Sequence, residues 1–200
     1  STVVGTCVAL GDKLEALAGL FGIGERPTGD KDPYALRRHP LGVLRILMEG
    51  RLPLPLTTLT AAAFDAFSGR FGPEARIELE RFLFDRLRGL LQDRGYTTLE
   101  IEAVVSLSPA RIDQVPALLG AVRAFSQLPE AQSLAAANKR IGNILKKAPA
   151  ASLRFDASLL YEPAERELSS AFDRIAPQAE GLLQKSDYRG MLLALAPLKG

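Results

Sequence analysis

The sequence predicts an all-α protein built as a helical bundle. No segment shows sustained alternation of apolar and polar residues, which disfavours a β-sheet, and apolar residues instead recur at helical spacing. Hydrophobic residues make up 47% of the 200-residue chain, so it can bury a core. Aromatic residues make up only 6%, and this core must therefore be built mainly from aliphatic side chains.

A first helix is predicted before the glycine-rich stretch at 22–24. Its apolar side is expected to hold Val8, Leu10, Leu14, Leu17, Ala18 and Phe21. A second helix is predicted to start at Asp32-Pro33, because Asp accepts hydrogen bonds from free N–H groups and Pro suits the first helical position. Pro40 lies inside this helix, where it removes a backbone bond at a cost of ~3 kcal/mol. We therefore expect a kink or a break near Arg38-His39.

The segment RLPLPL at 51–56 is predicted to be an extended connector, because each Pro pushes the preceding residue away from helical angles. Gly and Pro then separate a series of further amphipathic segments. Helices are predicted at about 57–69, 73–94, 97–107, 114–127, 130–147, 162–184 and 187–196. Residues 148–158 are predicted to form a loop.

Composition narrows the setting of the protein. Cys7 is the single cysteine, so an intrachain disulfide is excluded, which fits a reducing compartment. No apolar run approaches the ~20 residues of a membrane span, and the first residues do not resemble a secretion signal. We therefore expect a soluble, cytoplasmic protein, and both ends are interpreted as cuts within a longer chain.

The sequence offers little for catalysis. The FGIGERPTG segment contains GxG, but no strand precedes it and no GK[ST] follows it, so a helix stop and turn is the simpler interpretation. His39 and Cys7 are the only histidine and cysteine, which disfavours a catalytic triad and a zinc site. Asp12 and Glu15 are expected on an exposed helix face. We predict no catalytic residue and no metal ligand.

Positive charge is concentrated in the middle of the chain. Residues 105–150 hold six basic and two acidic residues (6 − 2 = +4), whereas residues 151–200 hold six basic and seven acidic ones (6 − 7 = −1). At ~100° per residue, about a third of the circumference of the 130–147 helix carries a cluster of polar and basic residues, namely Lys139, Arg140, Asn143, Lys146 and Lys147. The opposite side carries Leu134, Ala137, Ile141, Ile144 and Leu145 and is expected to pack in the bundle.

Two interpretations of this cationic side stay open. Binding a phosphate backbone would relieve the repulsion between the cations and release counterions, while Asn138 and Asn143 could bond to bases or sugars. Alternatively, the side is a solvated basic face, with Lys146 and Lys147 favoured near the helix C-terminus by a few tenths of a kcal/mol, roughly.

A second basic group consists of Lys31, Arg37, Arg38 and Arg45. It is interpreted either as a further contact surface or as a mixed surface paired with Asp30, Asp32 and Glu49. The helix around residues 82–95 is interpreted as scaffold, with Asp85–Arg88 and Glu78–Arg81 as ion pairs within the helix, each worth ~0.2–0.5 kcal/mol.

Several long blocks resemble the β subunit of bacterial-type glycyl-tRNA synthetase (glycine–tRNA ligase). These blocks are GDKLEALAGLFGIGERPTGDKDPYALRRHPLGVLRIL, FDRLRGLLQDRGYTTLEIEAVVS and AVRAFSQLPEAQSLAAANKRIGNILKK. The PTG.KDP.ALRR and AAANKRI.NILKK patterns are long enough to be specific. The resemblance covers nearly the whole chain in the same order, with two minor departures at Glu15 and at His39-Pro40.

The resemblance implies a domain organisation. Residues 1–50 would close a degenerate HD-like helical domain, residues 51–72 would form a connector and helix, and residues 73–200 would form part of an anticodon-binding helical domain like that of arginyl-tRNA synthetase. Asp12 matches the final Asp of the HD pattern, but the other HD ligands are not in this chain. The resemblance therefore implies no metal chemistry here.

The resemblance also implies a function. The family joins glycine to its tRNA with ATP, and the chemistry, with its ATP and Mg, resides in an α subunit that assembles with β as a hetero-oligomer. Lys139, Arg140, Asn143, Lys146, Lys147, Lys31, Arg37 and Arg38 then become candidate contacts for tRNA(Gly), and no cofactor is expected on this chain. Two alternatives are kept, namely a helical scaffold that docks the α subunit without touching RNA, and a remnant of an HD-type metal-dependent phosphohydrolase.

Overall fold

The computed structural model describes residues 2–26, 37–147 and 155–199 of the chain. Helices account for nearly all regular structure in these ranges, where the only β-type pairing is an isolated bridge between Pro55 and Arg111. The predicted all-α class is confirmed. None of the described helices combines the length and the apolar character needed to cross a bilayer.

The chain divides into two compact units, one covering residues 1–119 and the other residues 120–200. The division falls within the helix α6 (Val115–Ser126). The predicted connector at 51–56 lies within unit 1 and is non-helical from 52 to 55, but Arg51 is a turn residue with φ +48° and Leu56 already begins α3. The sequence-based division into residues 1–50, 51–72 and 73–200 stays a prediction.

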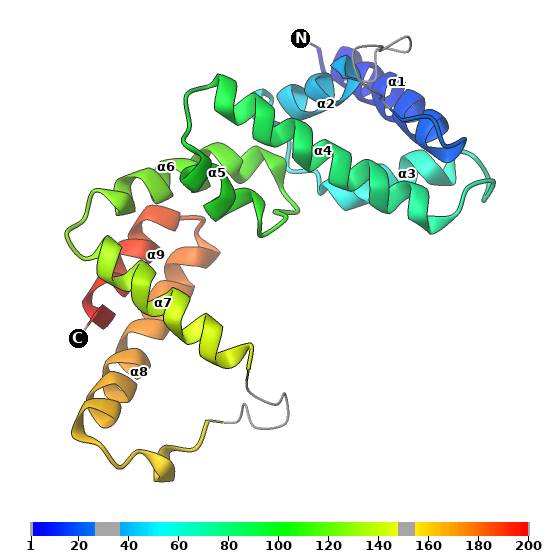
Figure 1. Cartoon of the computed structure of the whole chain (residues 1–200). Coiled ribbons are helices and arrows are strands. Elements are labelled where there is room, and N and C mark those ends of the chain that lie inside the picture. Colours follow the sequence, from blue (N-terminus) through cyan, green and yellow to red (C-terminus); the bar gives the residue numbers. More distant parts are fainter. Residues whose placement is uncertain (1, 27–36, 148–154, 200) are drawn as a thin grey trace. The chain divides into compact units, whose positions relative to one another are not determined.

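Unit 1 is arranged around the helix α4 (Pro73–Asp93). This helix packs against α1 (Val3–Gly22), α2 (Arg38–Glu49), α3 (Leu56–Asp65) and α5 (Thr98–Val105), as Figure 1 shows. A short 3₁₀ helix, η1 (Ile112–Gln114), lies against α2. The side of α4 that faces the core consists of Leu79, Leu83, Leu87, Leu90 and Leu91, all buried. Their spacing of three and four residues is that of a helix with one apolar side.

The helices of unit 1 start and end at residues that satisfy free backbone groups. Thr97 and Glu100 form a capping box at the start of α5, with the Thr97 N–H donating to Glu100 Oε2 at 2.8 Å. Gly95 follows the end of α4 with φ +82°, a conformation that disfavours any side chain. Its N–H donates to the Gln92 carbonyl at 2.9 Å, so one of the last carbonyls of α4 is satisfied.

Pro40 lies in the first turn of α2, which among the described residues begins at Arg38. A Pro in the first turn costs little, because the N–H that it lacks would have no helical partner there. The kink or break predicted near Arg38-His39 stays a prediction, because the residues before 37 lie outside the described ranges. The predicted start at Asp32-Pro33 lies outside the described residues.

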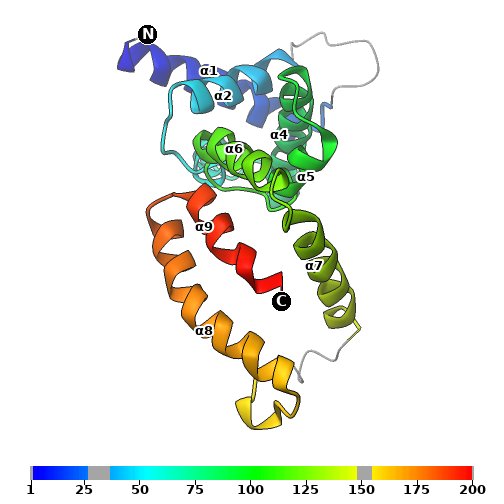
Figure 2. The same cartoon turned by 90° about the vertical axis from the view of Figure 1, so that its left-hand side faces the viewer.

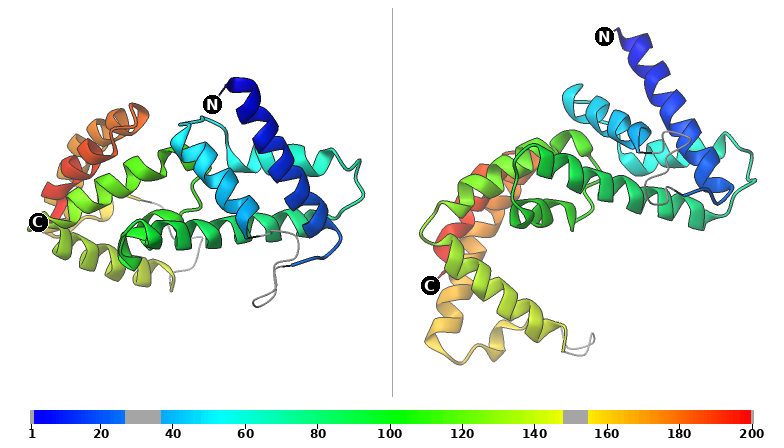
Figure 3. Two further views of the ribbon diagram at one scale, coloured as in Figure 1. Left: turned by 90° about the horizontal axis from the view of Figure 1, so that it is seen from above. Right: turned by 45° about the horizontal axis from the view of Figure 1, so that its top comes forward.

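The first turns of α1 extend past the other helices of unit 1, as Figure 3 shows. Val3, Val4 and Val8 are therefore exposed, with 66% of Val8 accessible. Helical spacing places Val8 on the apolar side of this helix, but it does not tell how far the neighbouring helices reach along that side. The other residues predicted on this side, Leu10, Leu14, Leu17, Ala18 and Phe21, are buried.

A buried hydroxyl joins α3 to α4. Thr60 is fully buried, and its Oγ1 lies 2.6 Å from Glu80 Oε1 and 3.1 Å from the Thr57 carbonyl. A hydroxyl has one hydrogen to donate, and a carboxylate is the stronger acceptor. Thr60 therefore stabilises the half-buried Glu80 carboxylate. The charged neighbour of this carboxylate is Arg76, whose Nε lies 3.9 Å from Glu80 Oε1.

We expect Thr60→Val to lower the free energy of unfolding by ~1–3 kcal/mol, because the Glu80 carboxylate loses a charge-assisted hydrogen bond at almost constant side-chain volume. Urea unfolding followed by far-ultraviolet circular dichroism measures this loss. Thr58→Val on the exposed side of α3 is the matched control and should change stability by less than ~0.5 kcal/mol. Equal effects of the two substitutions would contradict the role given to the buried hydroxyl.

An ion pair joins α4 to α5. Arg88 Nε donates to Glu102 Oε1 at 2.7 Å, and Arg88 Nη1 donates to Asp85 Oδ1 at 3.2 Å. The predicted Asp85–Arg88 pair is thus present. The hydrogen bond from Arg88 is the main cause that lowers the pKa of Glu102 below its ordinary value.

Because the pKa of Glu102 is lowered in the folded state, the free energy of unfolding depends on pH. A carboxyl whose pKa is lower in the folded state contributes stability above its unfolded pKa and loses it as the pH falls through the folded value. We expect the wild-type free energy of unfolding to fall more steeply between about pH 5 and pH 3 than that of Glu102→Gln. Unfolding curves across this range test it, and equal slopes in the wild type and in Glu102→Gln would contradict the role given to this carboxyl.

Unit 2 contains α7 (Ala131–Leu145), α8 (Pro163–Gln184) and α9 (Tyr188–Leu195), with the 3₁₀ helices η3 (Ala157–Leu159) and η4 (Ala196–Lys199). Figure 2 shows α8 and α9 side by side, joined by a short turn. Asp187 caps α9 by accepting from the Gly190 N–H at 2.8 Å. The hydrophobic side chains of unit 2 that are buried among the described residues are Ala121, Ala131, Ala179 and Tyr188.

Candidate nucleic-acid interface

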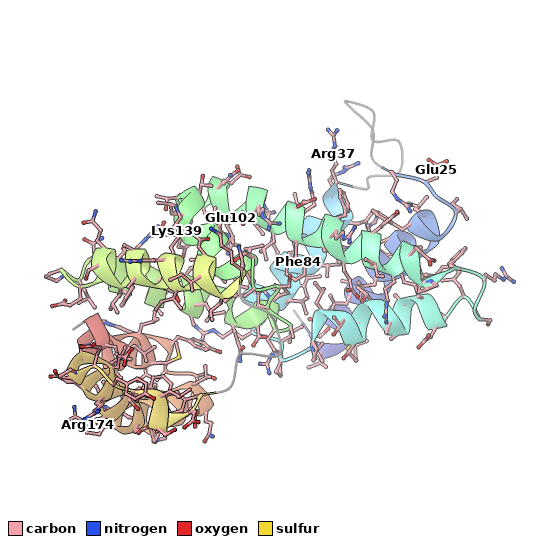
Figure 4. All side chains as sticks on the ribbon, turned by 60° about the horizontal axis from the view of Figure 1, so that its bottom comes forward. Glu25, Arg37, Phe84, Glu102, Lys139 and Arg174 are labelled. Atoms are coloured by element: carbon pink, nitrogen blue, oxygen red, sulfur yellow. The ribbon has the colours of Figure 1, made fainter. Side chains whose placement is uncertain are left out.

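The cationic side of α7 is presented to solvent. Lys139, Arg140 and Asn143 lie on the helix, Lys146 is its C-cap residue, and Lys147 follows in the next turn. All five side chains are exposed, and Lys139 can be seen extending from α7 in Figure 4. The name cationic surface is used below for these five residues. Asn138, beside them in sequence, is also exposed.

No cation of the cationic surface pairs with a carboxylate of the described residues. The charges of Lys139 and Arg140 therefore repel one another through solvent, and they lie too far from the C-terminal end to gain from the helix dipole. Lys146 and Lys147 lie at that end, where positive charge is favoured. Asn143 lies between the cations and adds hydrogen-bonding groups of both kinds.

The apolar side of α7 is not packed as the sequence predicts. Ile141, Ile144 and Leu145 have 52%, 58% and 47% of their surface exposed, and Ala137 is exposed too. Only Ala131 is buried on this helix, and Leu134 is half-buried. The main described neighbour of α7 is η4, a single short turn that is too small to cover four helical turns.

The second basic group is described only in part. Arg37 is half-buried just before α2, Arg38 and Arg45 are exposed on α2, and Lys31 lies outside the described residues. Glu49, the carboxylate expected among them, instead accepts from Arg94 Nη2 at 2.7 Å and joins the ends of α2 and α4. The role of Arg37 and Arg38 as tRNA contacts stays a prediction.

The other residues singled out in the sequence lie on α1 and α2. Cys7 is exposed on α1, and His39 is half-buried in the first turn of α2. Asp12 and Glu15 are exposed on α1, as expected, with Lys13 Nζ 3.8 Å from Asp12. Across residues 2–26, 37–147 and 155–199, no three His, Cys, Asp or Glu side chains gather in a way that could hold a metal ion.

One ion pair differs from the prediction, and it marks residues that the sequence did not single out. Glu78 pairs with Arg26, from the segment after α1, and not with Arg81 on its own helix. Arg26 Nε donates to Glu78 Oε2 at 2.8 Å. Helical spacing favours partners three or four residues away and holds no information about a partner 52 residues away.

Comparison with known proteins gives a consistent result. The family described as glycyl-tRNA synthetase beta subunit matches residues 1–106. The chain is 54% identical over 197 residues to the glycine–tRNA ligase beta subunit of Thiobacillus denitrificans. It is 55% identical over 196 residues to that of Leptothrix cholodnii and 52% identical over 198 residues to that of Methylobacillus flagellatus.

Each of these alignments covers 98% of this chain. The chain spans 27–28% of the length of these relatives, so it corresponds to little more than a quarter of each. The family match, which covers more than half of the chain, the agreement over its full length and the all-helical fold lead to one conclusion: the chain belongs to the glycyl-tRNA synthetase beta subunit family.

Proposed function

We propose that this chain is a tRNA-binding part of a glycine–tRNA ligase β subunit and that it contacts tRNA(Gly) through the cationic surface. The observation that carries the proposal is four cations on one helix, all exposed and none paired with a described carboxylate. Lys and Arg bind phosphates with release of counterions, and this term dominates most nucleic-acid affinities. Membership of the family supplies the class of RNA.

In this proposal the chain binds and positions tRNA(Gly), and the chemical reaction takes place in the α subunit. The cations hold phosphates, while Asn143 and Asn138 hydrogen-bond to exposed bases or to 2′-hydroxyls. ATP-dependent attachment of glycine, with its ATP and Mg, is assigned to an α subunit that assembles with β in the cytoplasm. Arg37 and Arg38 are proposed as secondary contacts.

A salt-dependent titration tests the proposal. The complete β subunit with its α partner is titrated with glycine tRNA and with the same tRNA carrying a changed anticodon. We expect the logarithm of the affinity to fall with the logarithm of salt by ~0.7–0.9 per phosphate contact. A changed anticodon should weaken binding with little change in that slope, because base contacts carry the sequence information. Equal affinity for the two tRNAs would contradict reading of the anticodon.

The exposed apolar side of α7 favours a second candidate function, namely a helical scaffold that docks the α subunit and touches no RNA. Ile141, Ile144 and Leu145 offer a hydrophobic surface of the kind found at protein interfaces. Replacing these three by serine separates the two candidates. The scaffold predicts loss of α-subunit binding by size-exclusion chromatography, whereas tRNA contact through the cationic surface predicts that α-subunit binding is kept.

A further inference from the structure

A hollow of about 470 Å³ opens on the surface of unit 1 beside α4. Three segments form it: the end of α1 with the residues that follow, the residue before α2, and the middle of α4 from 78 to 86. Its lining is charged and aromatic and consists of Phe21, Arg26, Arg37, Glu78, Arg81, Phe82, Asp85 and Arg86. Figure 4 labels Arg37 at its place before α2. The size lies in the range of small-ligand sites.

The floor of the hollow is a pair of aromatic rings. The centroids of Phe21 and Phe82 lie 5.4 Å apart. Arg26 covers the Phe21 ring with its guanidinium carbon 4.5 Å from the centroid, and Arg86 covers the Phe82 ring at 5.2 Å. A guanidinium stacked on a ring keeps its N–H groups in its own plane, where they can still donate.

The carboxylates of the hollow are already paired. Glu78 accepts from Arg26, whose Nη1 also donates to the Phe21 carbonyl at 2.8 Å and to the Glu25 carbonyl at 3.1 Å. Arg26 is therefore held in place by contacts to a side chain and to two backbone carbonyls. Asp85 pairs with Arg88 at 3.2 Å. Among the described residues, the lining holds four arginines and two carboxylates and has a formal charge of 4 − 2 = +2.

Arg86 is left with donors that the described residues do not satisfy. Its Nε is buried and has no hydrogen-bond partner among the residues that the structure describes. Neither Arg86 nor Arg81, which is exposed at the same hollow, forms an ion pair with a described carboxylate. A buried donor without a partner is rare in native proteins, and here it lies in a positively charged hollow.

We propose that this hollow binds a phosphate group, held by Arg86 and Arg81 against the aromatic floor. A phosphate supplies negative charge and several acceptor oxygens that match the fork of a guanidinium. An uncharged ligand would leave the charge of the two arginines uncompensated, and a stacked base would compete with the guanidinium group that already lies over each ring. The phosphate is either a diester of an RNA backbone or a terminal phosphate.

The test follows the Nε–H signal of Arg86 by ¹⁵N nuclear magnetic resonance in the 200-residue chain. Inorganic phosphate is titrated at constant ionic strength against chloride, and a saturable shift of this signal is expected. Arg81→Gln should raise the phosphate dissociation constant at least about fivefold, because one charge-assisted contact is lost. The double variant Arg45→Gln/Arg70→Gln, exposed in the same unit, is the matched control and should leave the constant unchanged.

A signal that moves no more with phosphate than with chloride would overturn the proposal, as would an equal dissociation constant in Arg81→Gln. Dephosphorylated single-stranded RNA that shifts the same signal identifies a backbone diester as the ligand. A shift with inorganic phosphate alone identifies a terminal or free phosphate.

The site does not depend on tRNA contact by α7. A variant with Lys139, Arg140, Lys146 and Lys147 changed to glutamine should keep the phosphate shift at Arg86 in full.

Discussion

Reversing Lys139, Arg140, Lys146 and Lys147 to glutamate should lower the affinity of the complete β subunit with its α partner for glycine tRNA by about 100-fold or more. Each charge-assisted hydrogen bond contributes ~1.5–3 kcal/mol, and ~1.4 kcal/mol corresponds to a factor of ten in affinity. Loss of two such contacts already gives the expected factor. The dependence of the affinity on salt should become shallower by ~0.7–0.9 for every phosphate contact removed.

The control for this variant carries the same number of reversals elsewhere. Arg70, Arg174, Lys185 and Arg189 are exposed, lie outside α7, and form no ion pair with a described carboxylate. Their reversal changes the net charge equally and should reduce affinity only through the general field of the protein. Equal losses in both variants would assign binding to net charge. An unchanged affinity in the α7 variant would favour the scaffold function.

Glutamate at positions 146 and 147 also opposes the dipole of α7, so the helix itself must be checked. Circular dichroism of the reversed variant should match the wild type within error. The milder variant with four glutamines removes the charge without this opposition. It should still show the shallower salt dependence, so that a binding defect cannot be ascribed to a melted helix end.

Leu87→Ala should lower the free energy of unfolding by ~2–5 kcal/mol, which is the second large effect expected. Leu87 has no exposed surface and lies on the side of α4 that faces the core of unit 1. Its truncation removes buried methyl groups and leaves a cavity that close-packed neighbours fill only in part. Domains are stable by only ~5–15 kcal/mol, so the loss is a large fraction of the total.

Urea unfolding followed by circular dichroism measures this loss as a lower midpoint with an unchanged slope. Leu99→Ala on α5 is the control, because 85% of Leu99 is exposed. It should change stability by less than ~0.5 kcal/mol. Comparable losses from both substitutions would mean that α4 is not the centre of the core.

Local signals in the sequence predict the helices well. The Gly-Pro step at 72–73 and Gly95 bound α4 because Pro suits the first helical turn and Gly the conformation after the last one. The connector at 51–55 follows from its prolines for the same kind of local reason. These features depend on residues within a few positions of each other, so one sequence is enough to predict them.

Contacts between distant segments could not be predicted in this way. The pairing of Glu78 with Arg26 and the meeting of Phe21 with Phe82 depend on how α1 is placed against α4. The sequence did not reveal the hollow beside α4 for this reason, because its arginines belong to three segments that are distant in the chain. The only local signal for it is the i, i+4 pair Phe82 and Arg86, which stack on α4.

The helix α7 shows both a feature that the sequence predicts and one that it does not. The residues of the cationic surface share one side of α7 because 100° per residue fixes their directions, and all of them are exposed. Whether the opposite side of α7 is buried depends on which other segments pack against it, and helical periodicity contains no information about those segments. Ile141, Ile144 and Leu145 are accordingly exposed where packing was expected.

The small number of buried side chains in unit 2 has a thermodynamic consequence. With Ala121, Ala131, Ala179 and Tyr188 as its buried hydrophobic residues among those described, the unit gains little free energy from removing apolar surface from water. A ligand that binds only the folded form adds to that free energy in proportion to the logarithm of its concentration. Folding of unit 2 and binding of a ligand to α7 are therefore linked. The melting temperature of unit 2 should rise with the concentration of that ligand.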